Sequence, residues 1–166
     1  MLSFVLTLTL ITKAFVSAQD CTNVEKLSIQ SWGLHVLYYQ NNKNYTDAAF
    51  KFRDAFIEQF ADFLDCQCTK DIHQKKLCLY FPQNLPDGPF PTANWAMFIP
   101  NNMYYKVVPW MIQRKQNFAL LLHPNTGCPR EDYTKLAIWG GQPMALDIDY
   151  FNSKSLNITP KQKFMN

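Results

Sequence analysis

Short apolar runs separated by polar turns dominate the chain. The run Leu34–Tyr39 lies between Gly33 and the polar sequence Gln-Asn-Asn-Lys-Asn, a pattern typical of a β-strand. Three further apolar runs have the same character, and the second and third strands are each followed by a proline. The pattern therefore predicts four strands, over Leu34–Tyr39, Leu77–Phe81, Trp95–Ile99 and Phe118–Leu122.

Two other segments carry apolar residues at helical spacing. Thr46 can cap a helix in which apolar residues recur at steps of three and four, at Ala49, Phe52, Phe56, Phe60 and Phe63. A second helix opens at Asn102, with Pro109 either kinking or restarting it, and its apolar residues are Met103, Val107, Trp110 and Met111. Such stripes indicate helix faces buried in a core rather than a cofactor site.

The resulting order is strand, helix, strand, strand, helix, strand. This order predicts an α+β fold of the ferredoxin-like plait type, a four-stranded antiparallel sheet with both helices on one face. In that topology the first and last strands are antiparallel neighbours. We therefore expect His35, on the first strand, to lie near His123, which directly follows the last.

The first 18 residues resemble a secretory signal peptide. They hold an apolar core of about ten residues, too short to span a bilayer, and end in Val16-Ser17-Ala18, which predicts cleavage before Gln19. We therefore expect a secreted protein without a transmembrane segment, with one domain over residues 19–150 and a polar C-terminal tail over 151–166.

Charge and motifs exclude several function classes. Without Lys13 the mature chain would hold 15 basic and 13 acidic residues, a formal charge of +2, so nothing directs it to nucleic acid. The chain contains no Gly-x-Ser-x-Gly and no His-Glu-x-x-His motif, so a hydrolase or protease has no support.

Cysteines and glycosylation sequons fit an extracellular protein. An oxidising compartment favours disulfides, and one plausible scheme joins Cys21 to Cys128 and either Cys66 or Cys68 to Cys78, leaving one cysteine over. A zinc site is the rival interpretation, but a single Cys-x-Cys supports it weakly. The sequons make N-glycans possible at two positions, Asn44 and Asn157.

The run His123-Pro124-Asn125-Thr126-Gly127 places an imidazole on a sharp turn after an apolar strand. A histidine held on a rigid turn is suited to act as a metal ligand or a general base. The alternative is a plain surface turn, with Asn and Gly chosen because they tolerate a positive φ.

Four segments resemble the DOPA 4,5-dioxygenase-like family. They are Val107-Val108-Pro109-Trp110-Met111, the strand and turn Phe118–Gly127, Ala137-Ile138-Trp139-Gly140 followed by Leu146-Asp147, and Gly88-Pro89-Phe90-Pro91. The family has further histidines that this chain lacks. Leu37, Phe90 and Tyr133 stand where the resemblance implies imidazoles, and Cys128 replaces an acid.

The resemblance implies catechol ring cleavage at non-haem iron, which commonly needs two imidazoles and a carboxylate. His35, His123 and Asp132 could form that metal set here, with the two histidines as the catalytic residues. Because so many polar positions are replaced, we expect a secreted, catalytically degenerate relative that needs no cofactor. Its partner would be an extracellular ligand or matrix, with the pocket lined by Leu37, Tyr39, Phe90 and Trp139. The alternative is an active iron(II) extradiol dioxygenase acting on catechols such as DOPA.

Overall fold

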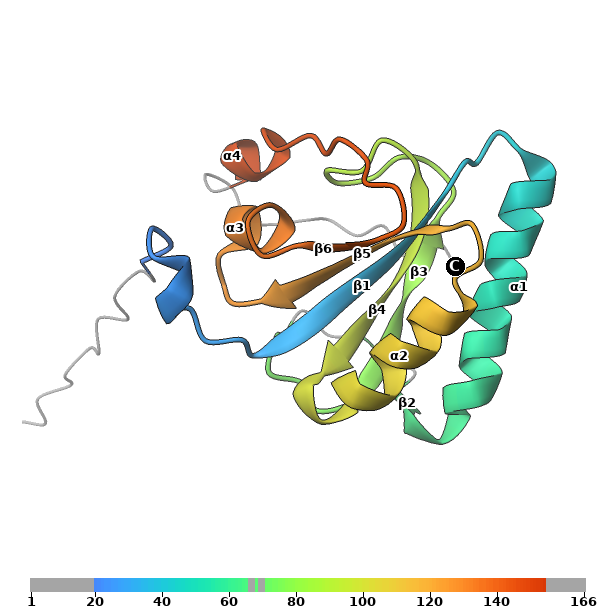
Figure 1. Cartoon of the computed structure of the whole chain (residues 1–166), viewed down its shortest axis with the longest axis horizontal. Helices are drawn as coiled ribbons and strands as arrows, with labels where there is room; N and C mark the ends of the chain where they lie inside the picture. Colours follow the sequence, from blue (N-terminus) through green and yellow to red (C-terminus); the bar gives the residue numbers. More distant parts are fainter. Residues whose placement is uncertain (1–19, 66–67, 69–70, 155–166) are drawn as a thin grey trace, which may run out of the picture.

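The computed structural model describes residues 20–65, 68 and 71–154, which form an α+β fold on one six-stranded sheet (Figure 1). The strands are β1 (Ser31–Tyr38), β2 (Leu64–Asp65), β3 (Leu77–Gln83), β4 (Ala93–Pro100), β5 (Ala119–Asn125) and β6 (Ile138–Gly140). The α-helices are α1 (Lys43–Phe60), α2 (Tyr104–Arg114), α3 (Pro129–Tyr133) and α4 (Tyr150–Lys154). Short 3-10 turns cover Val24–Lys26, Ala61–Phe63 and Asn101–Met103. The predicted α+β class is confirmed.

Strand β1 runs through the middle of the sheet (Figure 1). The strand order is β2-β3-β4-β1-β5-β6, and all neighbours are antiparallel except β2 and β3. Strand β1 pairs with β4 along its whole length and with β5 on its other side. The first and last predicted strands, β1 and β5, are thus antiparallel neighbours as expected.

The predicted number of four strands is wrong for the described part of the chain. Two further strands, β2 and β6, extend the sheet at its two edges. They have two and three residues, too short for apolar alternation to reveal them in the sequence. The four predicted strands are the four central ones.

Helices α1 and α2 cover one face of the sheet, as predicted. The side chains of Leu34 and Val36 on β1 are fully buried in a cluster that includes Phe56 of α1 and Met111 of α2. Burial of each such side chain contributes about 1.5–3 kcal/mol of transfer free energy. Because side chains alternate along a strand, His35 lies on the opposite face.

The start and end of α1 differ from the sequence prediction. Asn42, not Thr46, is the N-cap, because its side chain accepts a hydrogen bond from the backbone N–H of Tyr45. Thr46 lies inside the helix instead. Phe63 lies beyond the helix in a 3-10 turn and is 44% exposed, so it is not part of the buried stripe.

The face opposite α1 and α2 has its own cover, formed by α3, α4 and the segment between β6 and α4 (Figure 1). A second apolar cluster joins this cover to the sheet, and its buried members are Leu37, Phe90, Ala119 and Leu121. This second face carries the candidate site. None of the helices in the described ranges is long and apolar enough to cross a membrane.

Candidate functional site

Two histidines face each other on the sheet beneath α3. His35 projects from β1 and His123 from β5, and their Nε2 atoms are 3.3 Å apart. The two rings are nearly parallel, with centroids 5.4 Å apart. The proximity predicted from the strand order is therefore confirmed.

Gly33 makes room for the imidazole of His123. The two residues are paired across β1 and β5, and a Cβ atom on Gly33 would lie 2.3 Å from His123 Nε2. No real side chain tolerates that distance, so the ring of His123 occupies the space above this glycine. Sequence reasoning missed Gly33, although a glycine inside a strand is a known sign of close approach.

The hydrogen-bond partners of the two rings favour one tautomer of each. His123 Nδ1 lies 2.9 Å from the carbonyl oxygen of Pro124, which can only accept, so Nδ1 carries the proton and Nε2 a lone pair. His35 Nδ1 donates to Asn94 Oδ1 at 3.1 Å, and the hydroxyl of Tyr133 donates to His35 Nε2 at 3.1 Å. Both Nε2 atoms therefore present lone pairs to each other, and neither can donate to the other.

Burial keeps both imidazoles neutral. It lowers the pKa of His35 to about 4, against a smaller opposing effect of the hydrogen bond to Asn94. Burial, together with repulsion from His35, lowers the pKa of His123 to about 3. At neutral pH the pair therefore offers two uncharged acceptors rather than a positive charge.

These lowered pKa values predict a loss of stability on acidification. The unfolded chain binds protons near the ordinary histidine pKa of 6.5, while the folded protein resists them down to about 4 and about 3. The free energy of unfolding should therefore fall with pH below 6.5, by about 1.4 kcal/mol per pH unit for each histidine. Urea unfolding at several pH values measures this slope, and the double variant His35→Asn/His123→Asn should show a shallower one. An unchanged slope in the variant would contradict the prediction.

Tyr133 and Asn94 complete the site and were not predicted as functional residues. The Tyr133 ring, at the end of α3, stacks on His123 with centroids 3.9 Å apart. Burial raises the pKa of its hydroxyl, so the phenol stays protonated. The signal for Tyr133 was present in the sequence, since it stands where the family resemblance implies a histidine.

A cavity of about 280 Å³ opens over the two histidines. Of the expected pocket residues, Phe90 lines it, with its ring 4.5 Å from that of His35. Leu37 and Trp139 belong to the apolar cluster rather than to the lining. Tyr39 is 56% exposed and lines a separate hollow beside Thr92.

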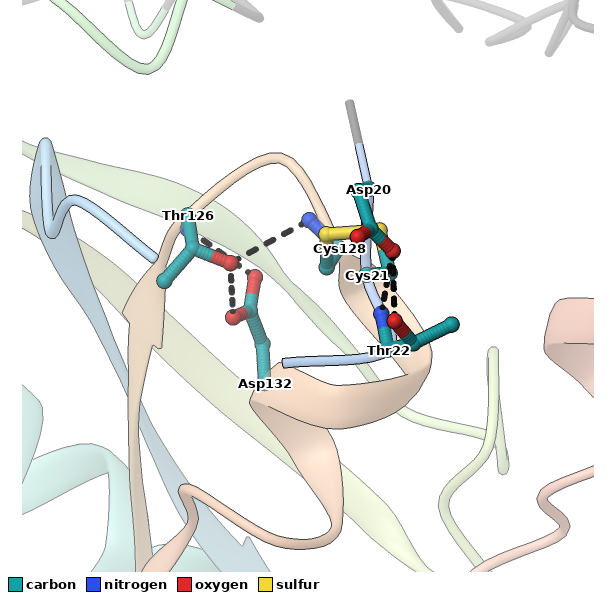
Figure 2. The surroundings of a disulfide bond; sticks show 6 residues. All are labelled: Asp20, Cys21, Thr22, Thr126, Cys128 and Asp132. Atoms are coloured by element: carbon teal, nitrogen blue, oxygen red, sulfur yellow. Dashed lines mark hydrogen bonds between the residues drawn. A yellow bond between two sulfur atoms is a disulfide. The ribbon is translucent and has the colours of Figure 1, made fainter. Parts of the chain in front are cut away.

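The carboxylate of Asp132 holds the turn that follows β5 (Figure 2). His123 lies inside β5, which continues to Asn125, so the prediction that it stands on the turn itself is wrong. It accepts hydrogen bonds from the backbone N–H and the hydroxyl of Thr126, at 3.1 and 2.6 Å. Burial raises the pKa of Asp132, against the lowering effect of those two hydrogen bonds. The same threonine oxygen accepts from the backbone N–H of Cys128 at 3.2 Å, so one buried carboxylate organises the whole turn.

The residues present do not fit the iron(II) set that the resemblance implied. Such sites use two imidazoles and a carboxylate, arranged around open positions. Within the described ranges, no three histidine, cysteine, aspartate or glutamate side chains are grouped to hold a metal ion. The carboxylate of Asp132 is directed at Thr126, and the polar side chains bonded to His35 are the amide of Asn94 and the protonated phenol of Tyr133.

Disulfides join Cys21 to Cys128 and Cys68 to Cys78, which is one of the schemes expected from the sequence. The first ties the N-terminal segment to the start of α3 (Figure 2). Cys66 lies outside the described residues.

The two sequons have different positions relative to the described chain. Asn44 is exposed in the first turn of α1, so its side chain is accessible to a glycan. Asn157 lies outside the described residues. N-glycosylation at either position stays a prediction.

Comparison with known proteins gives concordant results. The model of the Dopa 4,5-dioxygenase family matches residues 32–150. DOPA 4,5-dioxygenase of Amanita muscaria is 24% identical over 136 residues, which cover 82% of this chain but only 56% of the fungal enzyme. The crystal structure of a candidate dioxygenase from Nostoc punctiforme superposes with a TM-score of 0.57 and 22% identity, over 75% of this chain and 93% of that one.

The fold and the histidine pair define a small α+β protein with a pocket built on one sheet face. The family match spans both histidines, the turn after His123 and α3. The chain belongs to the Dopa 4,5-dioxygenase family, and the resemblance found in its sequence motifs is confirmed.

Proposed function

We propose that this protein is a secreted, non-catalytic member of its family that binds a small planar phenol over His35 and His123. The observation that carries the proposal is the Nε2 atom of His123. It holds a buried lone pair whose neighbour within hydrogen-bond distance, His35 Nε2, has no proton to donate. Because His123 lines the cavity, a phenolic hydroxyl bound there could donate to this Nε2 atom, and a hydrogen bond of this kind contributes about 0.5–1.5 kcal/mol.

The walls of the cavity favour a flat ring. Phe90 and Tyr133 both contact His35, with ring centroids 4.5 and 5.7 Å away from it. Aromatic pairs at such separations contribute about 0.5–1.5 kcal/mol beyond simple burial. The volume of about 280 Å³ lies near the lower end of the range for ligand pockets, about 300–1,000 Å³, and suits a single-ring ligand.

Two features support binding rather than ring cleavage. No carboxylate of the described residues lies with the two imidazoles, since Asp132 bonds to Thr126 instead. The hydroxyl of Tyr133, a neutral group, is bonded to His35. The matched region also spans just over half of the fungal DOPA 4,5-dioxygenase, so that enzyme's activity does not transfer directly.

The scaffold in this proposal is a ferredoxin-like plait, formed by β3, β4, β1 and β5, with edge strands added.

Secretion is part of the proposal. It is supported by the apolar segment that ends at Ala18 and by the two disulfides, which persist in oxidising compartments. Mass spectrometry of protein recovered from the culture medium would test it, with an N-terminus at Gln19 as the expected result. Retention of the intact N-terminus inside the cell would contradict secretion.

A titration with p-cresol tests the binding function. We expect p-cresol to shift the ring resonances of His35 and His123, and His123→Ala to weaken binding about tenfold, which corresponds to about 1.4 kcal/mol. The matched control is His73→Ala, which removes an exposed histidine before β3 and should leave the affinity unchanged. Equal affinity in wild type and His123→Ala would overturn the proposed contact.

A turnover assay tests the absence of catalysis. The purified chain is analysed for bound metals and then mixed with iron(II) and L-DOPA under air, and the yellow ring-opened product is followed by absorbance. We expect no product above the rate without protein. Stoichiometric iron together with turnover that His123→Ala abolishes would show an active dioxygenase instead.

A further inference from the structure

The pocket has an asymmetric charge. Among the described residues that line it, Asp87 is the one acidic residue, and no lysine or arginine takes part. The two histidines are neutral because of their burial. The cavity therefore combines uncharged acceptors at its base with one negative charge.

Asp87 is an exposed residue in the connection between β3 and β4. Within the described chain, no lysine, arginine or histidine forms a salt bridge with its carboxylate. The next residue, Gly88, has a φ of +64°, and a Cβ at that position would lie 3.6 Å from the Tyr150 ring. Asp87 is exposed and lines the same cavity as Tyr150, so it lies where that cavity meets solvent.

Aromatic rings continue from Tyr150 down to the histidines. Tyr150 contacts Phe151 with centroids 5.5 Å apart, and Phe151 contacts Tyr133 at 5.1 Å. Phe90 lies 6.0 Å from Tyr133, and Tyr80 lines the same cavity. A wall of aromatic faces beside a carboxylate is a common way to recognise an ammonium group, through cation–π attraction and ion pairing.

We propose that the ligand of this pocket is a phenolic amine that carries an ammonium group and no carboxylate. This inference rests on the proposed function, since the phenolic hydroxyl would donate to His123 Nε2. The ammonium group would then lie toward Asp87 and Tyr150. A ligand carboxylate in the same place would meet the charge of Asp87 and no lining cation.

Arg130 on α3 carries a positive charge, but it contacts α4 rather than the cavity. Its guanidinium donates a hydrogen bond to Asn152 of α4. The segment before α4 also carries acidic residues, and the backbone N–H of Asp147 donates to Pro89 at 2.9 Å. Among the described residues that line the cavity, no lysine or arginine offsets the charge of Asp87.

Four ligands with the same phenol ring test this inference on the full, disulfide-bonded chain. They are p-cresol, tyramine, 4-hydroxyphenylacetate and L-tyrosine, titrated while histidine and aromatic resonances are followed by NMR. We expect tyramine to bind about tenfold more tightly than 4-hydroxyphenylacetate, with p-cresol between them and L-tyrosine weaker than tyramine. The difference should shrink as salt is added, because the charges at the mouth are partly exposed.

A substitution at Asp87 tests whether its carboxylate causes the preference for the amine. Asp87→Asn should weaken tyramine binding about three- to fivefold more than it weakens p-cresol binding. The control Asp62→Asn removes the same charge from an exposed position that does not line this pocket, and should change neither affinity. If p-cresol binds but the amine has no advantage over the acid, this inference fails and the proposed function stands. If none of the four phenols binds, both fail.

Discussion

Replacing Gly33 with alanine is expected to displace the imidazole of His123 and to abolish most phenol binding. The added Cβ would lie 2.3 Å from Nε2 and 2.6 Å from Cε1 of that ring, so the ring must move. Forced overpacking of this kind costs about 1–3 kcal/mol of stability. The affinity for p-cresol should fall at least tenfold, measured by NMR titration, and urea unfolding should show the loss of stability.

A double-mutant cycle separates this clash from other effects of alanine. In a His123→Ala background the ring is absent, so Gly33→Ala should cost little further stability, which gives a coupling free energy of about 1–3 kcal/mol. Gly140→Ala is the matched control on β6, since its Cβ would meet Leu120 at 3.3 Å and no residue of the pocket. Wild-type affinity in Gly33→Ala would show that the imidazole has another accessible position.

Removal of the Cys21–Cys128 disulfide should lower the free energy of unfolding more than removal of the Cys68–Cys78 disulfide. The two cysteines are 107 residues apart, and closing a loop of that length stabilises the folded state by about 4.7 kcal/mol in the chain-entropy model, with typical measured values of about 2–4 kcal/mol. The variant Cys21→Ala/Cys128→Ala should therefore unfold at much lower urea concentration. The measurement is made with Cys66→Ala in every protein, so that no odd thiol exchanges with the bridges.

The second disulfide supplies the comparison. Cys68 and Cys78 are 10 residues apart, so the same chain-entropy relation gives about 2.7 kcal/mol for that bridge. The variant Cys68→Ala/Cys78→Ala should lose less stability than the variant without the long-range bridge. The reverse order would show that local structure around β3, rather than loop length, determines the effect.

The central part of the fold could be predicted because its pattern is regular. Apolar residues are regularly spaced from Ala49 to Phe60 and along the strands, because one face of each element is buried in the core. The edge strands β2 and β6 could not be predicted this way, since two or three residues hold no period. Thr46 and Asn42 are both good capping residues, and only the backbone geometry at Asn42 decides between them.

The candidate site was partly predictable for a different reason. The strand order alone brought His35 beside His123, because antiparallel neighbours fix which residues meet. The orientation of Asp132 could not be predicted, since a buried carboxylate can equally bind a metal or accept from a turn such as that of Thr126. Asn94 was missed because the third strand was predicted to begin at Trp95, whereas β4 begins at Ala93 and carries Asn94 beside β1, where its side chain accepts from His35.

The bridge between Cys21 and Cys128 also sets a condition on biosynthesis. Cys21 is made first and its partner last, while Cys66, Cys68 and Cys78 all emerge between them. At about 5–20 residues per second, the intervening chain takes roughly 5–20 s to synthesise. During that interval Cys21 can pair only with a wrong partner, so the native connectivity requires delayed oxidation or later exchange, which takes seconds to hours. The yield of correctly bridged protein therefore depends on the oxidants and isomerases that the nascent chain meets.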